Sequence, residues 1–282
     1  MSPLALYFVP FNTLTKKESI QLRGIISDDE VERVERYIGE KQQQQSLFVR
    51  AGLRILLSNY AKEHLIGVIE PQYWVFTKGK YGKPKLTDEL FNQTKIEFNL
   101  SHSGDWLLVG IIHHTQPINE INSEFCLGVD VERDRKNTKI HSILNRYFAK
   151  SEVVDLLALP SEALQRERFF DLWACKESYI KATGKGLSTP LGSFSFDLKD
   201  TALVSTNVIG DKSETTCDFQ LALSEKLKLT HNPNDIHSYW NSYLGRIDST
   251  YRFAVTYNKI KTKISFKLHK LECLFKFTSD VC

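Results

Sequence analysis

The sequence has few cysteines, no strong excess of charge of either sign, and no long run of apolar residues. Its five cysteines are an odd number, they are widely spaced, and none forms a Cys-x-x-Cys pair. This spacing argues against a disulfide framework and against a zinc knuckle, and it favours a reducing cytosol. The longest apolar run, residues 106–112, is far too short to cross a bilayer. With a formal net charge of +3, the chain also lacks the excess of basic residues that bulk binding to nucleic acid requires.

The composition is that of an ordinary globular protein, with 41% hydrophobic and 25% charged residues. A length of 282 residues allows one large domain or two smaller ones. The N-terminal segment has no basic n-region, and Pro10 interrupts its only apolar run, so we expect no signal peptide. We therefore expect a cytoplasmic protein that neither spans a membrane nor binds nucleic acid.

Helical and strand patterns occur in both halves of the chain, which predicts an α+β fold. The polar interval 115–124 is the best internal boundary. The helical patterns cover residues 27–61, 151–159 and 165–183. Strand patterns cover residues 4–9, 72–77, 96–100, 106–112, 128–132, 193–198, 217–223 and 251–257. The last stretch, 259–282, alternates lysine with apolar residues and predicts an appended edge strand or hairpin.

Residues 128–132 read Gly-Val-Asp-Val-Glu and form the first motif with chemical content. In a strand, residues i and i+2 point the same way, so Asp130 and Glu132 share one face. Two like charges side by side repel, whereas a divalent cation would make their proximity favourable, and carboxylate oxygens are the ligands that Mg²⁺ prefers. The alternative is a pair of exposed charges on an edge strand, which is the commoner case for such a pair alone.

The second motif lies on the predicted helix 165–183. Trp173, Glu177 and Lys181 are spaced i, i+4 and i+8, so they form one row along the helix. A glutamate and a lysine in that row could ligate a metal ion and hold the phosphate that the metal binds. The alternative is an ordinary surface Glu–Lys pair, which stabilises a helix by only a few tenths of a kcal/mol.

Two further segments could bind phosphate. Residues 99–104, Asn-Leu-Ser-His-Ser-Gly, place two hydroxyls, an imidazole and backbone N–H groups at a hairpin tip. The basic loop 78–85 contains glycines that let the backbone approach a ligand, and its spacing is not that of a Walker A loop. The alternatives are a polar turn for the first segment and a solvated basic turn for the second.

Taken in order, these segments resemble the Sfp-type 4′-phosphopantetheinyl transferases. The resemblance rests on Asn-Leu-Ser-His-Ser at 99–103, Gly-Val-Asp-Val-Glu at 128–132 and Trp-x-x-Lys-Glu-Ser-x-x-Lys at 173–181, and Tyr-Gly-Lys-Pro at 81–84 also fits. It implies transfer of the phosphopantetheine arm of coenzyme A to a serine of an apo acyl or peptidyl carrier protein, with release of 3′,5′-ADP. It also implies two similar α/β halves with the active site in the cleft between them. We place these halves at residues 1–122 and 123–258, and the extension 259–282 lies outside the resemblance.

The resemblance assigns a role to each matching residue. Asp130, Glu132 and Glu177 would be the Mg²⁺ ligands. Glu177, Lys181 and His102 would be the catalytic residues, with Glu177, directly or through a water molecule, as the base for the serine proton. At the pyrophosphate of coenzyme A, the contacts would be Lys181 and His102, with Lys176 in support. Lys83 and Pro84 would lie near the adenine. Ser101 would lie on the 3′-phosphate side, together with one arginine of the N-terminal helices. Of Arg33, Arg36, Arg50 and Arg54, we select Arg50 for that contact.

The carrier protein would dock beside the segment 133–150, where basic residues outnumber acidic ones. Carrier proteins of this kind are typically acidic, so such a patch would steer their association. The alternative is a solvated connecting segment. Because the cleft forms within one chain, we expect a monomer.

Two other functions compete with this prediction. A Mg²⁺-dependent nuclease also uses clustered Asp, Glu and Lys residues, but the low net charge and the absence of aromatics interleaved with lysines argue against it. The second is a module that binds coenzyme A or a carrier protein without chemistry. The complete set of three carboxylates argues against that alternative.

Overall fold

The structure is a computed structural model that describes residues 4–114, 125–199, 201–207, 209–210, 220–224, 228–230, 240–258 and 263–268. Its helices are α1 (Lys16–Arg23), α2 (Asp28–Glu35), α3 (Glu40–Glu63), α4 (Asp88–Thr94), α5 (Ile140–Tyr147), α6 (Lys150–Leu157) and α7 (Glu162–Thr183), with short 3₁₀ turns η1 (Pro71–Tyr73), η3 (Gly186–Ser188) and η4 (Leu191–Ser193). The strands of the first half are β1 (Leu4–Pro10), β2 (Phe76–Lys78), β3 (Pro84–Leu86), β4 (Ile96–Ser103) and β5 (Trp106–His113). The later strands are β6 (Leu127–Arg133), β7 (Ser195–Asp197), β8 (Val204–Asn207), β9 (Ile209–Gly210), β10 (Gln220–Ser224), β11 (Lys228–Thr230), β12 (Asn241–Arg246), β13 (Tyr251–Tyr257) and β14 (Ile264–Leu268).

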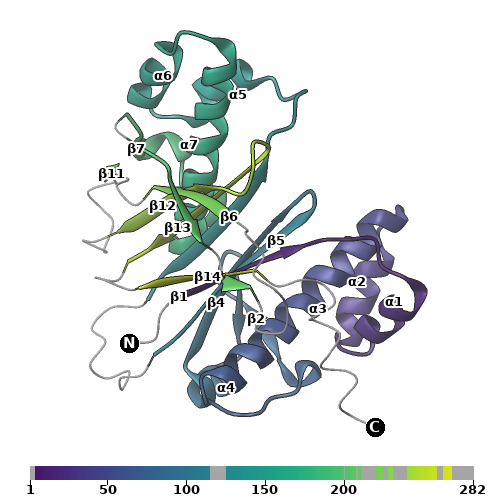
Figure 1. The fold of residues 1–282 in the computed structure, drawn as a ribbon. Coiled ribbons are helices and arrows are strands. Elements are labelled where there is room, and N and C mark those ends of the chain that lie inside the picture. The colour runs from purple at the N-terminus through teal and green to yellow at the C-terminus, as the bar shows by residue number, and fades with distance from the viewer. Residues whose placement is uncertain are drawn as a thin grey trace.

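Two five-stranded sheets form the centre of the described structure. Their strand orders are β4-β5-β1-β14-β9 and β6-β13-β12-β10-β8. Alternate residues of β1 belong to two different cores, because Tyr7 and Val9 pack with α3 while Leu6 and Phe8 pack with β6 and β13. The first sheet therefore lies between α3 and the second sheet, and α7 covers the outer face of the second sheet (Figure 1). The expected mixed α and β content in both halves is thus present.

Strands β4 and β6 come from different sheets and lie side by side where the sheets meet. The backbone N–H of Val129 on β6 donates to Asn99 Oδ1 on β4 at 2.9 Å. Farther along, the Ser103 hydroxyl accepts from the Arg133 N–H at 3.2 Å. These contacts bring the motifs 99–103 and 128–132 together across the junction.

Gly128 lets helix α7 approach strand β6. A Cβ atom at this position would lie 1.9 Å from the carbonyl oxygen of Ser178 and 2.3 Å from the backbone nitrogen of Ala182. Both atoms belong to the α7 backbone, which cannot move aside as a flexible side chain could. The first residue of the motif 128–132 thus sets the separation between the strand and the helix that carry the candidate site residues.

The C-terminal extension differs from the prediction of an edge strand. Strand β14 pairs in parallel with β1, where Leu6 is opposite Phe266, and it also pairs in parallel with β9. It is therefore an inner strand of the first sheet. The proposed boundary between residues 122 and 123 and the tail 269–282 lie outside the described residues, so the division into 1–122, 123–258 and 259–282 stays a prediction.

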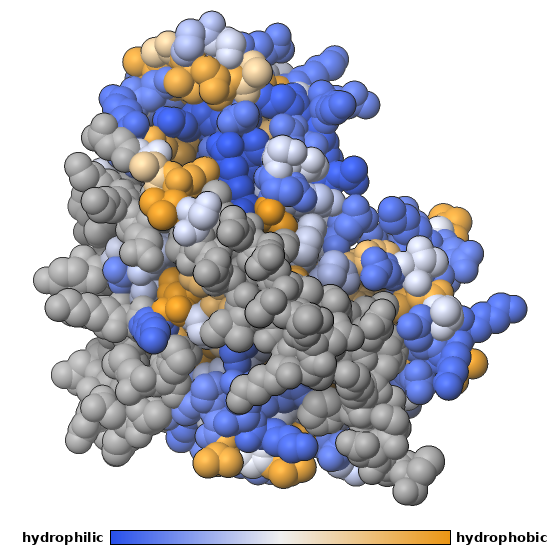
Figure 2. All heavy atoms as spheres, viewed as in Figure 1, coloured by the Kyte–Doolittle hydropathy of each residue, from blue (hydrophilic) through white to orange (hydrophobic). Residues whose placement is uncertain are grey.

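The helical segment predicted over 27–61 is two helices. Ser27 begins α2, where its N–H donates to Glu30 Oε2 at 3.1 Å, and α3 begins at Glu40. The glutamine run 42–45 lies within α3 rather than in a loop. Among the described helices, none combines the length and the apolar composition needed to cross a bilayer. The described surface in Figure 2 is mainly hydrophilic, with an apolar patch over α5 and α6, where Val154 and Leu157 are exposed.

Candidate active site at the junction of the two sheets

A cluster of charged and hydroxyl side chains lies where β4, β6 and α7 meet. Lys181 Nζ on α7 is 2.6 Å from Asp130 Oδ1 on β6, and it also donates to Ser101 Oγ on β4 at 2.8 Å. The Ser101 hydroxyl donates to the same Asp130 oxygen at 2.9 Å. Asp130 is only 1% exposed. Three elements from distant parts of the sequence thus converge on one buried carboxylate.

Glu132 and Glu177 flank this carboxylate and are both half-buried. Burial, and then the negative charge of Asp130, raise the pKa of each of them to about 7, although the positive charge of Lys181 opposes the rise. Glu177 also contributes to the raised pKa of Glu132. The site therefore carries more negative charge than Lys181 alone neutralises.

These residues could hold a hard cation. Asp130 Oδ2 is buried and has no hydrogen-bond partner among the described residues. A buried carboxylate oxygen without a donor is costly, and two neighbouring glutamates with raised pKa values indicate the same lack of positive charge. The oxygen-only donor set suits Mg²⁺ rather than a softer metal. Within the described part of the chain, no three His, Cys, Asp or Glu side chains are arranged closely enough to hold a metal ion as they stand, and the Lys181 ammonium lies against Asp130.

Two further residues of the motif 99–103 have structural contacts that the sequence did not predict. Asn99 and Ser103 alternate with Ser101 along β4, so all three face β6. Asn99 accepts from the backbone of Val129, and the Ser103 hydroxyl donates to Glu132 Oε2 at 3.4 Å. The i, i+2, i+4 spacing in the motif 99–103 was the signal that could have found them.

A cavity of about 900 Å³ lies between α3, β4 and the β2–β3 hairpin. His102 and Pro84, both predicted site residues, form part of its wall, as does Arg50 of α3. The Arg50 guanidinium donates to Ser46 Oγ at 2.5 Å. Partial desolvation, and then the positive charges of Lys181 and Arg50, lower the pKa of His102. His102 is therefore within electrostatic reach of both the cavity arginine and the cluster lysine.

The acidic Glu30 also lines this cavity, next to a buried arginine. Arg54 Nη2 is 2.6 Å from Glu30 Oε2, and the Arg54 guanidinium also donates to the carbonyl oxygen of Trp74. Arg54 is only 3% exposed. This arginine is engaged within the fold, so Arg50 remains the better placed of the two for a ligand in the cavity.

Two lysines that were predicted to contact the ligand do not line the cavity of about 900 Å³. Lys176 is fully buried, with its Nζ 2.8 Å from Glu152 Oε2, so the structure does not bring it to the cluster around Asp130. Lys83 Nζ donates to the carbonyl oxygens of Leu127 at 2.8 Å and Ala182 at 3.4 Å. It therefore links β6 to the end of α7, and it lines a second cavity of about 540 Å³ with Pro84.

Two family models match this chain on either side of the junction. The model described as the 4′-phosphopantetheinyl transferase superfamily matches residues 126–237, which include the carboxylates and Lys181. The model described as 4′-phosphopantetheinyl transferase, N-terminal, matches residues 14–114, which include Arg50 and His102. Together they cover both halves that contribute to the cluster.

Individual relatives agree with the family models. A Synechocystis sp. protein that carries the name of a 4′-phosphopantetheinyl transferase is 31% identical over 218 residues, which cover 77% of this chain and 78% of the relative. The 4′-phosphopantetheinyl transferase Sfp of Bacillus subtilis is 31% identical over 192 residues, covering 68% of this chain and 75% of the relative. The 4′-phosphopantetheinyl transferase HetI of a Nostoc species is 33% identical over 167 residues, covering 59% and 63%. The resemblance found in the motifs is confirmed, and the transferase is favoured over the nuclease and over a module without chemistry. The chain belongs to the 4′-phosphopantetheinyl transferase superfamily and is a transferase of the Sfp type.

Proposed function

We propose that this protein transfers the 4′-phosphopantetheine arm of coenzyme A to a serine of an apo acyl or peptidyl carrier protein, with Mg²⁺, and releases 3′,5′-ADP. The observation that carries the proposal is the cluster of Asp130, Lys181 and Ser101 together with the cavity of about 900 Å³, which is lined by Leu100 and His102, the two neighbours of Ser101 on β4. His102 links the cavity to the cluster, because its side chain lines the cavity and the positive charge of Lys181 contributes to the lowering of its pKa.

Coenzyme A would occupy this cavity with its pyrophosphate toward the cluster. Pro84 would lie near the adenine, and Arg50 would bind the 3′-phosphate. Lys181 has three N–H groups, of which two are used by Asp130 and Ser101, so a third can donate to a phosphate oxygen. His102 would contact the pyrophosphate, and Lys83 would hold the neighbouring ends of β6 and α7 together.

Asp130, Glu132 and Glu177 would hold Mg²⁺. When bound, the cation supplies positive charge that stabilises the transition state and the leaving 3′,5′-ADP. The buried Asp130 oxygen without a hydrogen-bond partner and the raised pKa values of both glutamates support this assignment.

The carrier serine would attack the phosphorus attached to pantetheine. Its oxygen forms the new P–O bond, the P–O bond to the ADP phosphate breaks, and the serine proton must leave. Glu177, directly or through a water molecule that it orients, would accept this proton. A serine hydroxyl is a weak nucleophile, so positioning by the surrounding residues would supply much of the rate.

The carrier would dock over a third cavity, of about 860 Å³, at the end of β6. Arg133, Arg135 and Lys136 line it, together with Lys41 at the start of α3. This location overlaps the basic segment 133–150 that the sequence singles out. An acidic carrier approaching here would bring its serine to the cluster from a side that coenzyme A does not occupy.

We further propose that the protein acts as a monomer in the cytoplasm. The cluster and the cavities of about 900 Å³ and 860 Å³ are formed by one chain, so no second copy is required. The five cysteines are widely spaced and none forms a Cys-x-x-Cys pair, which supports a reducing compartment. Light scattering coupled to size-exclusion chromatography tests the first point, and a dimer that dissociates with loss of activity would contradict it.

Intact-mass spectrometry of the carrier tests the transferase proposal. The protein is incubated with coenzyme A, Mg²⁺ and each of several apo carrier proteins, and the nucleotide product is identified by chromatography. We expect one phosphopantetheine group per carrier and an equal amount of 3′,5′-ADP, and neither product with EDTA. The matched control is Asp130→Asn, which keeps the size of the side chain but removes its charge. If no carrier gains mass with the wild type, the proposed function is wrong.

A further inference from the structure

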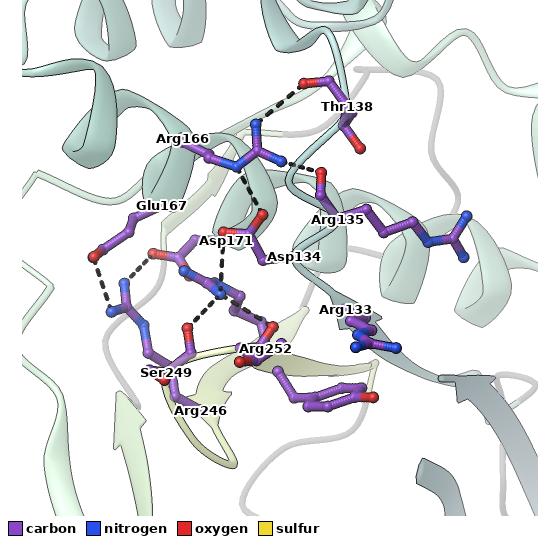
Figure 3. A network of polar contacts seen from close by, with 12 residues as sticks. Arg133, Asp134, Arg135, Thr138, Arg166, Glu167, Asp171, Arg246, Ser249 and Arg252 are labelled. Carbon is purple, nitrogen blue, oxygen red and sulfur yellow. Dashed lines mark hydrogen bonds and ion pairs between the residues drawn. The ribbon is translucent and has the colours of Figure 1, made fainter. Parts of the chain in front are cut away.

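Arg166 lies on α7 about three turns before Glu177 and has no part in the proposed chemistry. Its guanidinium makes three contacts with the segment that follows β6 (Figure 3). Arg166 Nε donates to Asp134 Oδ1 at 2.7 Å, and Nη1 donates to the Thr138 carbonyl oxygen at 3.1 Å. Nη2 donates to the carbonyl oxygen of Arg135. One side chain therefore holds both ends of the segment 134–138.

The surroundings keep this guanidinium in place. Its Cζ atom lies 5.2 Å from the centroid of the Phe170 ring, one turn later on α7, and that ring is buried. Arg166 and Asp134 are both about four-fifths buried, with side-chain exposures of 21% and 19%. A planar guanidinium with several acceptors in fixed positions loses little freedom for each hydrogen bond that it forms.

The segment is also held from its other side. The Asp134 N–H donates to the carbonyl oxygen of Thr250 at 2.8 Å, in the turn between β12 and β13. Buried Arg252 lies 3.9 Å from Asp134 Oδ2 and 3.4 Å from Asp171 Oδ1, and Asp171 in turn accepts from Arg246 at 2.8 Å. Figure 3 shows that these side chains form one continuous network between α7 and the β12–β13 turn.

This network reaches the wall of the cavity of about 860 Å³ through Asp134. Asp134 is the acidic side chain in its wall, and two guanidiniums neutralise it from behind. Arg133, Arg135 and Lys136, by contrast, are exposed. Arg135 is also close to the catalytic cluster, since it is one of the positive charges that oppose the rise in the pKa of Glu132 caused by burial and by Asp130. The cavity wall therefore carries four basic side chains, and its acidic side chain, Asp134, is paired with Arg166.

We infer that Arg166 is a positioning residue for carrier recognition. It fixes the segment 134–138 so that the basic side chains of that segment meet an acidic partner, and it keeps Asp134 from opposing that partner. The inference rests on the proposed function, because it names a determinant of the acceptor substrate. It assigns no part in coenzyme A binding to Arg166, which does not line the cavity of about 900 Å³.

The test is Arg166→Lys, which keeps the positive charge but cannot contact three acceptors at once. Transfer rates are measured against carrier concentration at saturating coenzyme A, and against coenzyme A concentration at saturating carrier. We expect the KM for an acidic carrier to rise roughly tenfold, a factor that corresponds to about 1.4 kcal/mol. The kcat and the KM for coenzyme A should stay within about twofold of the wild type, whereas a general loss of structure would change them too.

The matched control is Arg168→Lys, on the same helix and half-buried like Arg166, for which we expect no change in either KM. Hydrogen exchange gives a second measurement: the amides of residues 135–138 should exchange faster in Arg166→Lys. If that variant does not fold, Arg166→Gln is measured in its place. The inference would be overturned if the KM for the carrier did not change, or if the KM for the carrier and the KM for coenzyme A rose by the same factor. The wild type is measured first, and if it modifies no carrier, the proposed function itself fails.

Discussion

Replacing Lys176 with methionine removes one partner of a fully buried ion pair in the second half of the molecule. Lys176 Nζ lies 2.8 Å from Glu152 Oε2, and the two side chains are 0% and 1% exposed. The same ammonium donates to the carbonyl oxygens of Leu191 at 2.7 Å and Phe194 at 2.8 Å. It therefore joins α7 to α6 and to the 3₁₀ turn η4.

The expected loss of stability follows from these contacts. Removing one partner of a buried ion pair costs about 3–5 kcal/mol, because the remaining charge stays buried without compensation. Glu152 keeps two backbone donors, the N–H groups of Ala149 at 2.8 Å and Phe196 at 2.9 Å. These donors favour the ionised carboxylate, so we expect about 3 kcal/mol, a large part of the 5–15 kcal/mol that is typical of a folded domain.

Urea denaturation at pH 7 and pH 5 measures this loss. Burial already raises the pKa of Glu152 above its value in the unfolded chain, and Lys176 opposes this rise. Without Lys176, the pKa of Glu152 should therefore rise further. A raised carboxyl pKa destabilises the fold above that pKa, so the difference between Lys176→Met and the wild type should shrink as the pH falls. The double variant Lys176→Met/Glu152→Gln should recover part of the stability at pH 7.

The result that would refute this reasoning is a loss below about 1 kcal/mol at pH 7, well under the range for a broken buried pair. If the KM for coenzyme A also rose in a variant of wild-type stability, Lys176 would act in binding, as the sequence motif predicted. We expect the reverse, with unchanged KM for coenzyme A in the fraction of the variant that is folded.

Three further predictions follow from the structure. Gly128→Ala should destabilise the protein by about 1–3 kcal/mol in urea denaturation and lower transfer activity, because its Cβ would meet the α7 backbone. The control Gly67→Ala, with open space around it, should change neither stability nor activity. Asp130→Asn should abolish transfer at every Mg²⁺ concentration while leaving the protein folded, because relief of the repulsion between Asp130 and the two glutamates offsets part of the loss of its ion pair with Lys181; full activity would contradict the metal assignment. Burial, and then the charges of His64 and His114, lower the pKa of His113 to about 4. The protein should therefore lose stability as the pH falls from about 6.5 towards 4, and His113→Gln should lessen that loss. An equal loss of stability in the variant and the wild type would show that other groups cause it.

Much of the candidate site could be predicted from local spacing. The i, i+2 spacing of Asp130 and Glu132 and the i, i+4 spacing of Glu177 and Lys181 place each pair on one face of its element. The sequence alone does not reveal that the strand and the helix touch. That contact depends on Gly128, whose missing side chain lets α7 pack directly against β6.

The position of Lys176 in the core could have been predicted from helical spacing. It is adjacent to Glu177 in the sequence, but neighbours on a helix point about 100° apart. Lys176 falls in the row of Leu172 and Ile180, which are both buried in the core, whereas Glu177 falls in the row of Lys181. Helical periodicity, applied to the motif residue by residue, would have separated the two roles.

The position of β14 could not be obtained from local patterns. Its alternation of apolar residues predicts a strand, but its parallel partner β1 is at the opposite end of the sequence. Pairing over such a separation depends on the tertiary fold and not on propensity. Arg54 is a similar case, because its basic side chain suits a phosphate, and only the structure reveals its ion pair with Glu30.

The central claim is that Asp130, Glu132 and Glu177 hold the divalent cation that acts on the pyrophosphate of coenzyme A. Anomalous diffraction from crystals grown with Mn²⁺, which also prefers carboxylate oxygens, and coenzyme A tests it most directly. We predict a single strong peak between these three side chains and next to the pyrophosphate. A peak elsewhere on the molecule, or a bound coenzyme A whose pyrophosphate lies away from these carboxylates, would contradict the account.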